Sequence, residues 1–197
     1  GGLAALAVIT AAAVSVTTGA GRLVSFTAAP DRIMGTSCRL VASVPPGEAS
    51  TAERGLAAAE QALRRVEARM STWIESSEIS KLNQAGADVL VELSDESLHV
   101  LREAKRLAAA TGGAFDITAR PMFEQWKATA AEGRLPTEQE LTGARAVSSW
   151  PAIKLTDRGA IKRVRTAQVD LSGIAKGYAI DRAVEAMRNA GVARGVV

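Results

Sequence analysis

The chain has 197 residues, of which 47% are hydrophobic and 23% charged, a globular composition that excludes intrinsic disorder and a multi-span membrane protein. Its net charge of +3 comes from interleaved basic and acidic residues, so nucleic acid is not an expected partner. Cys38 is the only cysteine and His99 the only histidine. We therefore expect no internal disulfide, no cysteine-based zinc site and no His-dependent catalysis, with His99 as a helix-surface or packing residue.

The N-terminal segment is unusually apolar. Residues 1–21 carry no charge, and Leu3–Val16 consists mainly of Ala, Val, Leu and Ile. This pattern is typical of an export signal or a single membrane anchor, and its alternative is a buried Ala-rich helix. No Met and no basic region precede the segment, so we expect its natural start to be missing. The sequence therefore predicts an export or anchor segment over residues 1–29 and one folded domain over 30–197.

Strands and amphipathic helices alternate after this segment. Residues 38–44 alternate loosely and end at Pro45–Gly47, which predicts a strand and a turn. Ser50–Glu53 has the pattern of a capping box, and apolar residues then recur at three- and four-residue steps in a long predicted helix. Ser94 is the predicted start of a second helix, which ends at Gly112. Both helices are expected to have packing roles.

The second half of the chain continues the mixture with shorter elements. They are a helical turn from Pro121, a helix start at Thr137–Glu140, a hairpin over 153–164, a strand at Val169–Leu171, a helix from Gly173 to Gly191 and a strand from Gly195. No internal repeat or low-complexity linker separates these elements. The sequence therefore predicts an α+β fold.

The stretch Val169–Asp181 is the most informative motif. Its predicted strand, small-residue turn and helix start would bring free backbone N–H groups together with Lys176, an arrangement that suits phosphate or pyrophosphate. The glycine spacings of a P-loop and of a dinucleotide-binding Rossmann motif are both absent, which excludes those two sites. The residues alone leave two alternatives open: a phosphate site, or a plain helix start with a solvated Lys176.

Four segments carry a resemblance to a known family. They are Met34–Thr36, Ser71–Asn83, Gly113–Thr118 and Asp170–Asp181. In order and approximate spacing they resemble the FAD:protein FMN transferase (ApbE-like) family, over roughly residues 32–197. The resemblance implies a T-fold-related domain that is incomplete at its C-terminus.

The resemblance also implies site residues. FAD contacts are implied at Met34, Trp73, Asn83, Ala114, Phe115, Asp116, Asp170 and Lys176. A Mg²⁺ ligand is implied at the main-chain carbonyl of Gly173, while side-chain metal ligands and catalytic residues are expected beyond Val197.

Other interpretations of these residues stay open. Trp73 stands where the family usually has a Tyr that packs on the isoalloxazine ring, and its alternative is an ordinary core Trp. Asn83 has the alternative of a helix cap, and Phe115 that of a buried side chain. Asp181 also fits the motif, with pairing to Arg182 or another base as its alternative.

The function implied by the resemblance is a Mg²⁺-dependent, exported transferase. It would cleave FAD and attach FMN through a phosphoester to a Thr or Ser of a target flavoprotein, releasing AMP. The implied partner is a subunit of a membrane redox complex on the periplasmic side of the bacterial inner membrane. The alternatives are an FAD pyrophosphatase, in which water replaces the protein hydroxyl, and a non-catalytic exported flavin-binding protein. The 197-residue chain alone is expected to be inactive.

Overall fold

The computed structural model describes residues 23–197. These residues form two compact units: the first joins residues 23–67 with Lys176–Val197, and the second is Ala68–Ala175. The mixture of helices and antiparallel sheets confirms the predicted α+β class. The sequence suggested no division of residues 30–197, because the first unit is built from two stretches that lie far apart in the chain.

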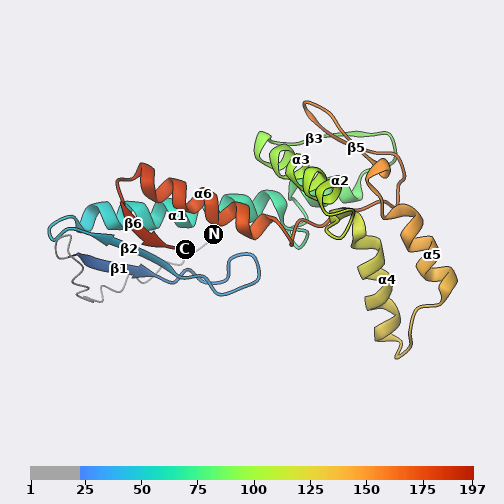
Figure 1. The fold of residues 1–197 in the computed structure, drawn as a ribbon, viewed down its shortest axis with the longest axis horizontal. Helices are drawn as coiled ribbons and strands as arrows, with labels where there is room; N and C mark the ends of the chain where they lie inside the picture. The colour runs from blue at the N-terminus through green and yellow to red at the C-terminus, as the bar shows by residue number, and fades with distance from the viewer. Residues whose placement is uncertain (1–22) are drawn as a thin grey trace. The chain divides into compact units, whose positions relative to one another are not determined.

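The first unit is a three-stranded antiparallel sheet with two helices. Its strands are β1 (Val24–Ala28), β2 (Leu40–Val44) and β6 (Arg194–Val196), in the order β1-β2-β6. Helices α1 (Ala49–Met70) and α6 (Ala175–Asn189) run along this sheet (Figure 1). The buried core is made by alternate residues of β2 and by the apolar faces of the helices, among them Leu40, Val44, Leu56, Val66, Ala183 and Met187.

The start of α1 differs from the prediction. The helix begins at Ala49, so Ser50 lies in its first turn and not at its cap. The reason is the preceding turn: the Glu48 N–H donates to the Pro45 carbonyl, and the Glu48 carbonyl accepts from the Thr51 and Ala52 N–H groups. The backbone therefore enters the helix before Ser50 can cap it.

Strand β1 lies inside the segment 1–29 that the sequence assigns to export or anchoring. The apolar stretch on which that assignment depends, Leu3–Val16, lies outside the described residues. Within residues 23–197, none of the helices combines the length and the apolar character needed to cross a bilayer.

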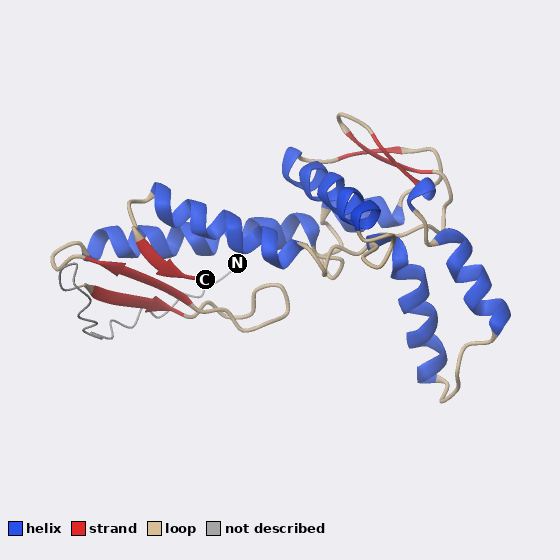
Figure 2. Ribbon diagram, viewed as in Figure 1, coloured by secondary structure: helices blue, strands red, loops and turns tan. Residues whose placement is uncertain are grey.

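The second unit packs helices beside a small antiparallel sheet (Figure 2). Its strands are β3 (Leu90–Glu92), β4 (Ile153–Leu155) and β5 (Gly159–Lys162), in the order β3-β5-β4. Its helices are α2 (Glu78–Gln84), α3 (Asp95–Ala110), α4 (Arg120–Ala131) and α5 (Glu138–Val147), with 3₁₀ turns η1 (Ile117–Ala119) and η2 (Trp150–Ala152).

Several predicted boundaries in this unit are confirmed. Ser94 caps α3 by accepting the Ser97 N–H, and Thr137 with Glu140 forms a complete capping box at α5. The hairpin is also present, since β4 and β5 pair antiparallel.

The predicted strand at Val169–Leu171 is wrong. These residues belong to no sheet. Both backbone groups of Val169 are bonded to the side-chain amide of Asn83, and the Asp170 N–H donates to the Ile117 carbonyl. A side chain has taken the place that a neighbouring strand would fill.

Candidate functional site

A pocket of ≈ 310 Å³ in the second unit collects five of the residues predicted to form the site. They are Ala114, Phe115, Asp116, Asp170 and Gly173. We call it the Asp170 pocket. It brings together two segments that are more than fifty residues apart in sequence.

The wall formed by Ala114–Asp116 is fixed by the end of α3 and the start of η1. The Phe115 N–H donates to Thr111 Oγ1 at 3.1 Å. Oδ1 of Asp116 accepts from both the N–H and the hydroxyl of Thr118, each at 2.8 Å. One carboxylate oxygen of Asp116 is therefore used as a cap for η1 and holds the wall in shape.

Phe115 and Gly173 lie in close contact across the pocket wall. A Cβ atom at position 173 would lie 3.0 Å from Cε2 of Phe115, tighter than most packing contacts, so the ring would have to shift to accommodate it. Glycine at this position therefore allows the turn to approach the ring. Phe115 is half-buried, so the alternative of a fully buried side chain is wrong.

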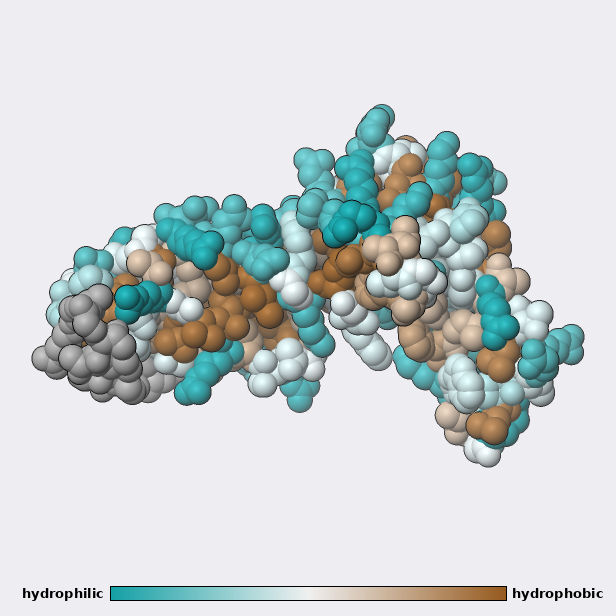
Figure 3. Space-filling view, in the orientation of Figure 1, coloured by the Kyte–Doolittle hydropathy of each residue, from teal (hydrophilic) through white to brown (hydrophobic). Residues whose placement is uncertain are grey.

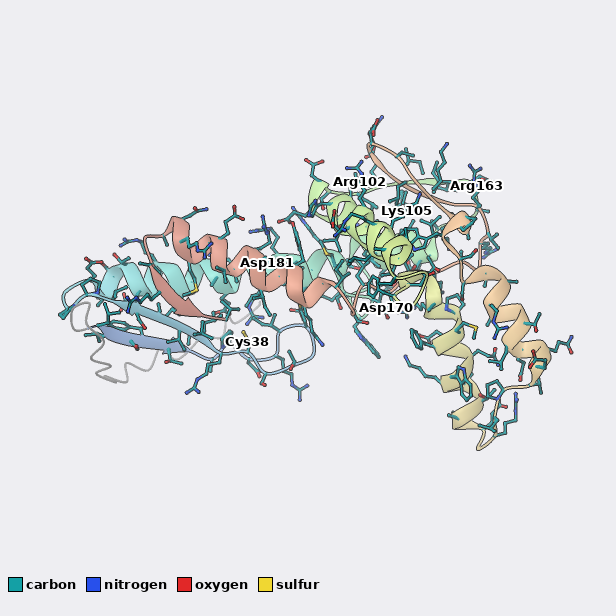
Figure 4. The ribbon with its side chains drawn as sticks, in the orientation of Figure 1. Cys38, Arg102, Lys105, Arg163, Asp170 and Asp181 are labelled. Carbon is teal, nitrogen blue, oxygen red and sulfur yellow. The ribbon has the colours of Figure 1, made fainter. Side chains whose placement is uncertain are left out.

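Asp170 is oriented from both sides. Its Oδ1 accepts the Ser172 N–H at 2.8 Å, and its Oδ2 lies 3.3 Å from Nη1 of Arg120. Arg120 is held in turn by Gln168, to which its Nε donates at 3.2 Å. The carboxylate of Asp170 is labelled in Figure 4, in the segment that precedes α6.

The segment that leads into Asp170 is held by what we call the clamp, formed by Asn83, Lys162 and Val169. The Asn83 side chain donates to the Val169 carbonyl at 2.9 Å and accepts the Val169 N–H at 2.8 Å. Lys162 Nζ donates to the carbonyls of Asn83 and Arg165, both at 2.7 Å. Asn83 is therefore not the cap of α2, and in the described structure its side chain fixes the backbone beside Asp170.

Lys162, the charged residue of the clamp, is fully buried, with 0% of its surface exposed. Burial lowers the pKa of Lys162 from its ordinary value, and the nearby positive charge of Arg165 lowers it further. Its ammonium group is satisfied by backbone carbonyls, which assigns it a structural role.

The turn before α6 differs from the predicted phosphate cradle. The N–H groups of Ile174 and Ala175 both donate to the Leu171 carbonyl, at 2.9 and 2.8 Å, and that of Ser172 is taken by Asp170. These donors are not free for a ligand. The exposed side chain of Lys176, in the first turn of α6, offers a positive charge to an anion.

Met34 and Lys176 line a second pocket, of ≈ 240 Å³, which belongs to the first unit. We call it the Met34 pocket. Leu63 and Ile180 supply apolar walls, and Cys38 lies at its lining, where burial raises the pKa of the thiol and the charge of Glu60 raises it further. The structure thus divides seven of the nine predicted residues between two pockets, one in each unit, and Trp73 and Asn83 line neither of them.

Trp73 is 90% exposed, so its alternative as a core residue is wrong. Lys127 Nζ of α4 lies 5.9 Å from the centroid of the Trp73 ring, within cation–π range. Phe123 and Trp126 of α4 are 59% and 45% exposed. Figure 3 shows hydrophobic residues among polar ones on the surface of the α4–α5 pair.

Asp181 lies exposed on α6, where Figure 4 labels it. The predicted alternative was a pair with Arg182 or another base, and Arg182 pairs with Glu185 at 2.7 Å. Asp181 lines neither of the two pockets described above.

The described residues do not make a magnesium site by themselves. Residues 23–197 contain no cluster of three or more His, Cys, Asp or Glu side chains placed to hold a metal ion. Two carboxylates share the pocket with Gly173: Asp170 is already engaged by Ser172 and Arg120, and one oxygen of Asp116 is engaged by Thr118. A single carbonyl does not hold Mg²⁺ against its hydration shell.

Sequence reasoning missed several residues that shape the two pockets. No sequence pattern singles out Arg120, Phe123, Glu67 or Lys162 as a site residue. The partners of Arg120, Glu67 and Lys162 lie up to 79 residues away, so no local pattern marks them.

Comparison with known proteins finds one family and relatives that share a single name. The sequence profile of the ApbE family matches residues 34–197. The FAD:protein FMN transferase of Vibrio cholerae is 32% identical over 136 residues, which cover 68% of this chain and 40% of the relative. That of Haemophilus influenzae is 33% identical over 146 residues, which cover 69% of this chain and 41% of the relative. The chain thus spans about two fifths of the length of these curated relatives.

Solved structures of ApbE proteins have a fold similar to that of this chain. The flavin transferase ApbE from Vibrio cholerae superposes with a TM-score of 0.76 at 26% identity, covering 88% of this chain and 56% of that one. The ApbE protein of Thermotoga maritima superposes with a TM-score of 0.69 at 28% identity, covering 81% of this chain and 52% of that one. The fold seen here is therefore that of the corresponding part of these proteins.

Proposed function

The chain belongs to the ApbE family, and from that premise we propose that it is part of a flavin transferase that cleaves FAD and attaches FMN to a target flavoprotein. The observation that supports this most directly is the Asp170 pocket, where four positions implied as FAD contacts converge with Gly173, the implied Mg²⁺ ligand. Two further positions, Met34 and Lys176, share the Met34 pocket. Relatives with the same segments carry the name FAD:protein FMN transferase.

The proposed reaction is a displacement at phosphorus. A Thr or Ser hydroxyl oxygen of the acceptor bonds to the FMN phosphorus, the bond from that phosphorus to the bridging oxygen of FAD breaks, and AMP leaves with that oxygen. The hydroxyl proton passes to solvent or to a base outside the described residues. Lys176 supplies an exposed positive charge for the phosphates, which acts most strongly where charge accumulates in the transition state.

The remaining contacts would serve to orient the substrate. Phe115 presents a half-buried ring beside Gly173, and Trp73 presents an almost fully exposed one. Aromatic faces of this kind stack on flat heterocycles such as flavin or adenine. Asp170, held by Arg120 and Ser172, presents a fixed carboxylate at the same pocket as Phe115.

Mg²⁺ dependence is a further part of the proposal and rests on the family resemblance. The ion would neutralise charge on the pyrophosphate, with Gly173 as the ligand from this chain. The described residues contain no cluster of three or more metal-ligating side chains, so the proposal assigns the remaining ligands to other parts of the protein. Chelation with EDTA should abolish transfer, and adding Mg²⁺ should restore it.

The acceptor and the location are also proposed. We place the protein on the periplasmic side of the bacterial inner membrane, with a subunit of a membrane redox complex as acceptor. The support is the uncharged stretch at the N-terminus of the sequence and the family resemblance.

Incubation of the full-length protein with FAD, Mg²⁺ and a candidate acceptor tests the proposal. The expected result is flavin fluorescence that stays on the acceptor after denaturation, with release of AMP. Release of AMP and free FMN with an unlabelled acceptor would show a pyrophosphatase instead. FAD binding without any AMP release would show a non-catalytic flavin-binding protein.

A further inference from the structure

The turn Ile33–Thr36 in the first unit has an unusual backbone. Ile33 and Thr36 exchange two backbone hydrogen bonds, of 3.3 and 3.1 Å, and enclose Met34 and Gly35 at the tip. Both tip residues have positive φ angles, 52° for Met34 and 72° for Gly35, as in a type I′ turn. Glycine adopts this conformation freely, whereas a residue with a side chain, such as Met34, is strained in it.

A side chain from α1 holds this turn. Oε1 of Glu67 accepts the Met34 N–H at 2.6 Å, a short hydrogen bond to a charged acceptor. One helical turn earlier on the same helix, Arg64 Nη2 donates to the Asp31 carbonyl at 3.4 Å. Positions three apart share a helix face, so α1 holds the loop at two neighbouring points.

The strained residue is also a pocket residue. Met34 lines the Met34 pocket together with Lys176, and its side chain is half-buried. Strain of this kind persists only where the surroundings enforce it, and it is concentrated at ligand sites. In this turn the enforcing contact at Met34 is the Glu67 carboxylate, which is separated from it by 33 positions in sequence.

We propose that Glu67 is a positioning residue of the Met34 pocket: its carboxylate holds the turn Ile33–Thr36 in the left-handed shape that presents Met34 to the bound flavin. The inference rests on the proposed function, because it assumes that FAD is the ligand of this pocket. Glu67 itself acts through the Met34 backbone and touches no ligand atom in this scheme.

The first experiment measures FAD affinity of the full-length protein by flavin fluorescence, with thermal unfolding in parallel. Glu67→Ala should raise the Kd for FAD about tenfold, because the turn loses the contact that offsets its strain. Glu67→Gln keeps an acceptor oxygen and should stay within about twofold of the wild type. Glu53→Ala is the matched control, since Glu53 is an exposed carboxylate on the same helix, and it should leave the Kd unchanged.

A double-mutant cycle with Met34→Gly separates positioning from general stability. Glycine at position 34 adopts the positive φ without strain but lacks the presented side chain, so its Kd for FAD should already be raised. In that background Glu67→Ala should add less than about twofold. A full additional tenfold loss would mean that Glu67 acts independently of Met34, which overturns the inference.

The outcomes distinguish this inference from the proposed function. A wild-type protein that binds no FAD overturns both. A wild-type protein that binds FAD, with a Glu67→Ala variant that binds it equally well, overturns the role of Glu67 alone. Failure of Glu67→Gln to restore affinity would also contradict it, because the side chain would then act through its charge and not through the hydrogen bond.

Discussion

Two lysines of this chain occupy opposite environments. Lys162 is fully buried in the clamp, where its ammonium group donates to two backbone carbonyls at 2.7 Å. Lys176 is exposed at the start of α6 and lines the Met34 pocket. The comparison shows how one residue type serves the fold at one position and remains available for a ligand at the other. A change at Lys162 should therefore affect stability, and a change at Lys176 should affect binding.

The largest expected effect on stability is that of Lys162→Met. The substitution leaves the carbonyls of Asn83 and Arg165 buried without their donor, which should lower the free energy of unfolding by about 2–4 kcal/mol. Urea unfolding measures this change in the free energy of unfolding. Lys154→Met, at an exposed position of β4, is the matched control and should change stability by less than about 0.5 kcal/mol. Equal effects at the two positions would remove the structural role assigned to Lys162.

The substitution Asn83→Asp should cause the next largest loss of stability. The change removes the N–H donor to the Val169 carbonyl and places a carboxylate oxygen against it, at a cost of about 2 kcal/mol. Asn189→Asp, the same substitution at an exposed position at the end of α6, should cost less than about 1 kcal/mol. Thermal unfolding compares the two variants, and an Asn83→Asp protein as stable as the wild type would mean that the clamp does not hold Val169.

Alanine substitutions of the two glycines that flank Lys176, Gly173 and Gly177, should change the stability of the protein in opposite directions. Gly173→Ala places a Cβ atom 3.0 Å from the Phe115 ring and should destabilise the protein by about 1 kcal/mol. Gly177→Ala meets no heavy atom within 4 Å and lies in α6, so it should stabilise the protein by about 0.5–1 kcal/mol. Thermal unfolding tests the signs, and stabilisation by Gly173→Ala would contradict the close contact with Phe115.

The smallest expected effect is a dependence on alkaline pH. Because burial lowers the pKa of Lys162 below 10.5, the unfolded chain binds more protons than the folded one between the two pKa values. The free energy of unfolding should therefore rise with pH through that window in the wild type, relative to Lys162→Met. Urea unfolding across this alkaline range measures the difference, and parallel curves for the two proteins would show that the buried amine does not titrate as described.

The sequence predicted the parts of this molecule whose signals are local. The helix caps at Ser94 and at Thr137 with Glu140 could be predicted because each cap joins residues only three apart in sequence. The hairpin of β4 and β5 could be predicted from its turn. The expectation that Phe115 and Asp170 lie in one site came only from the resemblance to a family, since no periodicity connects residues that far apart.

Contacts distant in sequence explain what sequence reasoning missed. Val169 has the composition of a strand, yet its backbone is paired by the side chain of Asn83, 86 positions earlier. Three N–H groups of the predicted cradle, those of Ser172, Ile174 and Ala175, are likewise bonded within the turn. Glu67 looks like one more charged residue on α1 until the structure shows its contact with Met34.

Substitution of Lys176 by Met in the full-length protein, followed by titration with FAD and by thermal unfolding, tests the assignment of this lysine to the ligand. We expect the Kd for FAD to rise by about tenfold or more, as for the loss of one charged contact to phosphate, with an unchanged unfolding temperature. A variant that binds and processes FAD like the wild type, or one that loses stability as Lys162→Met does, would contradict it.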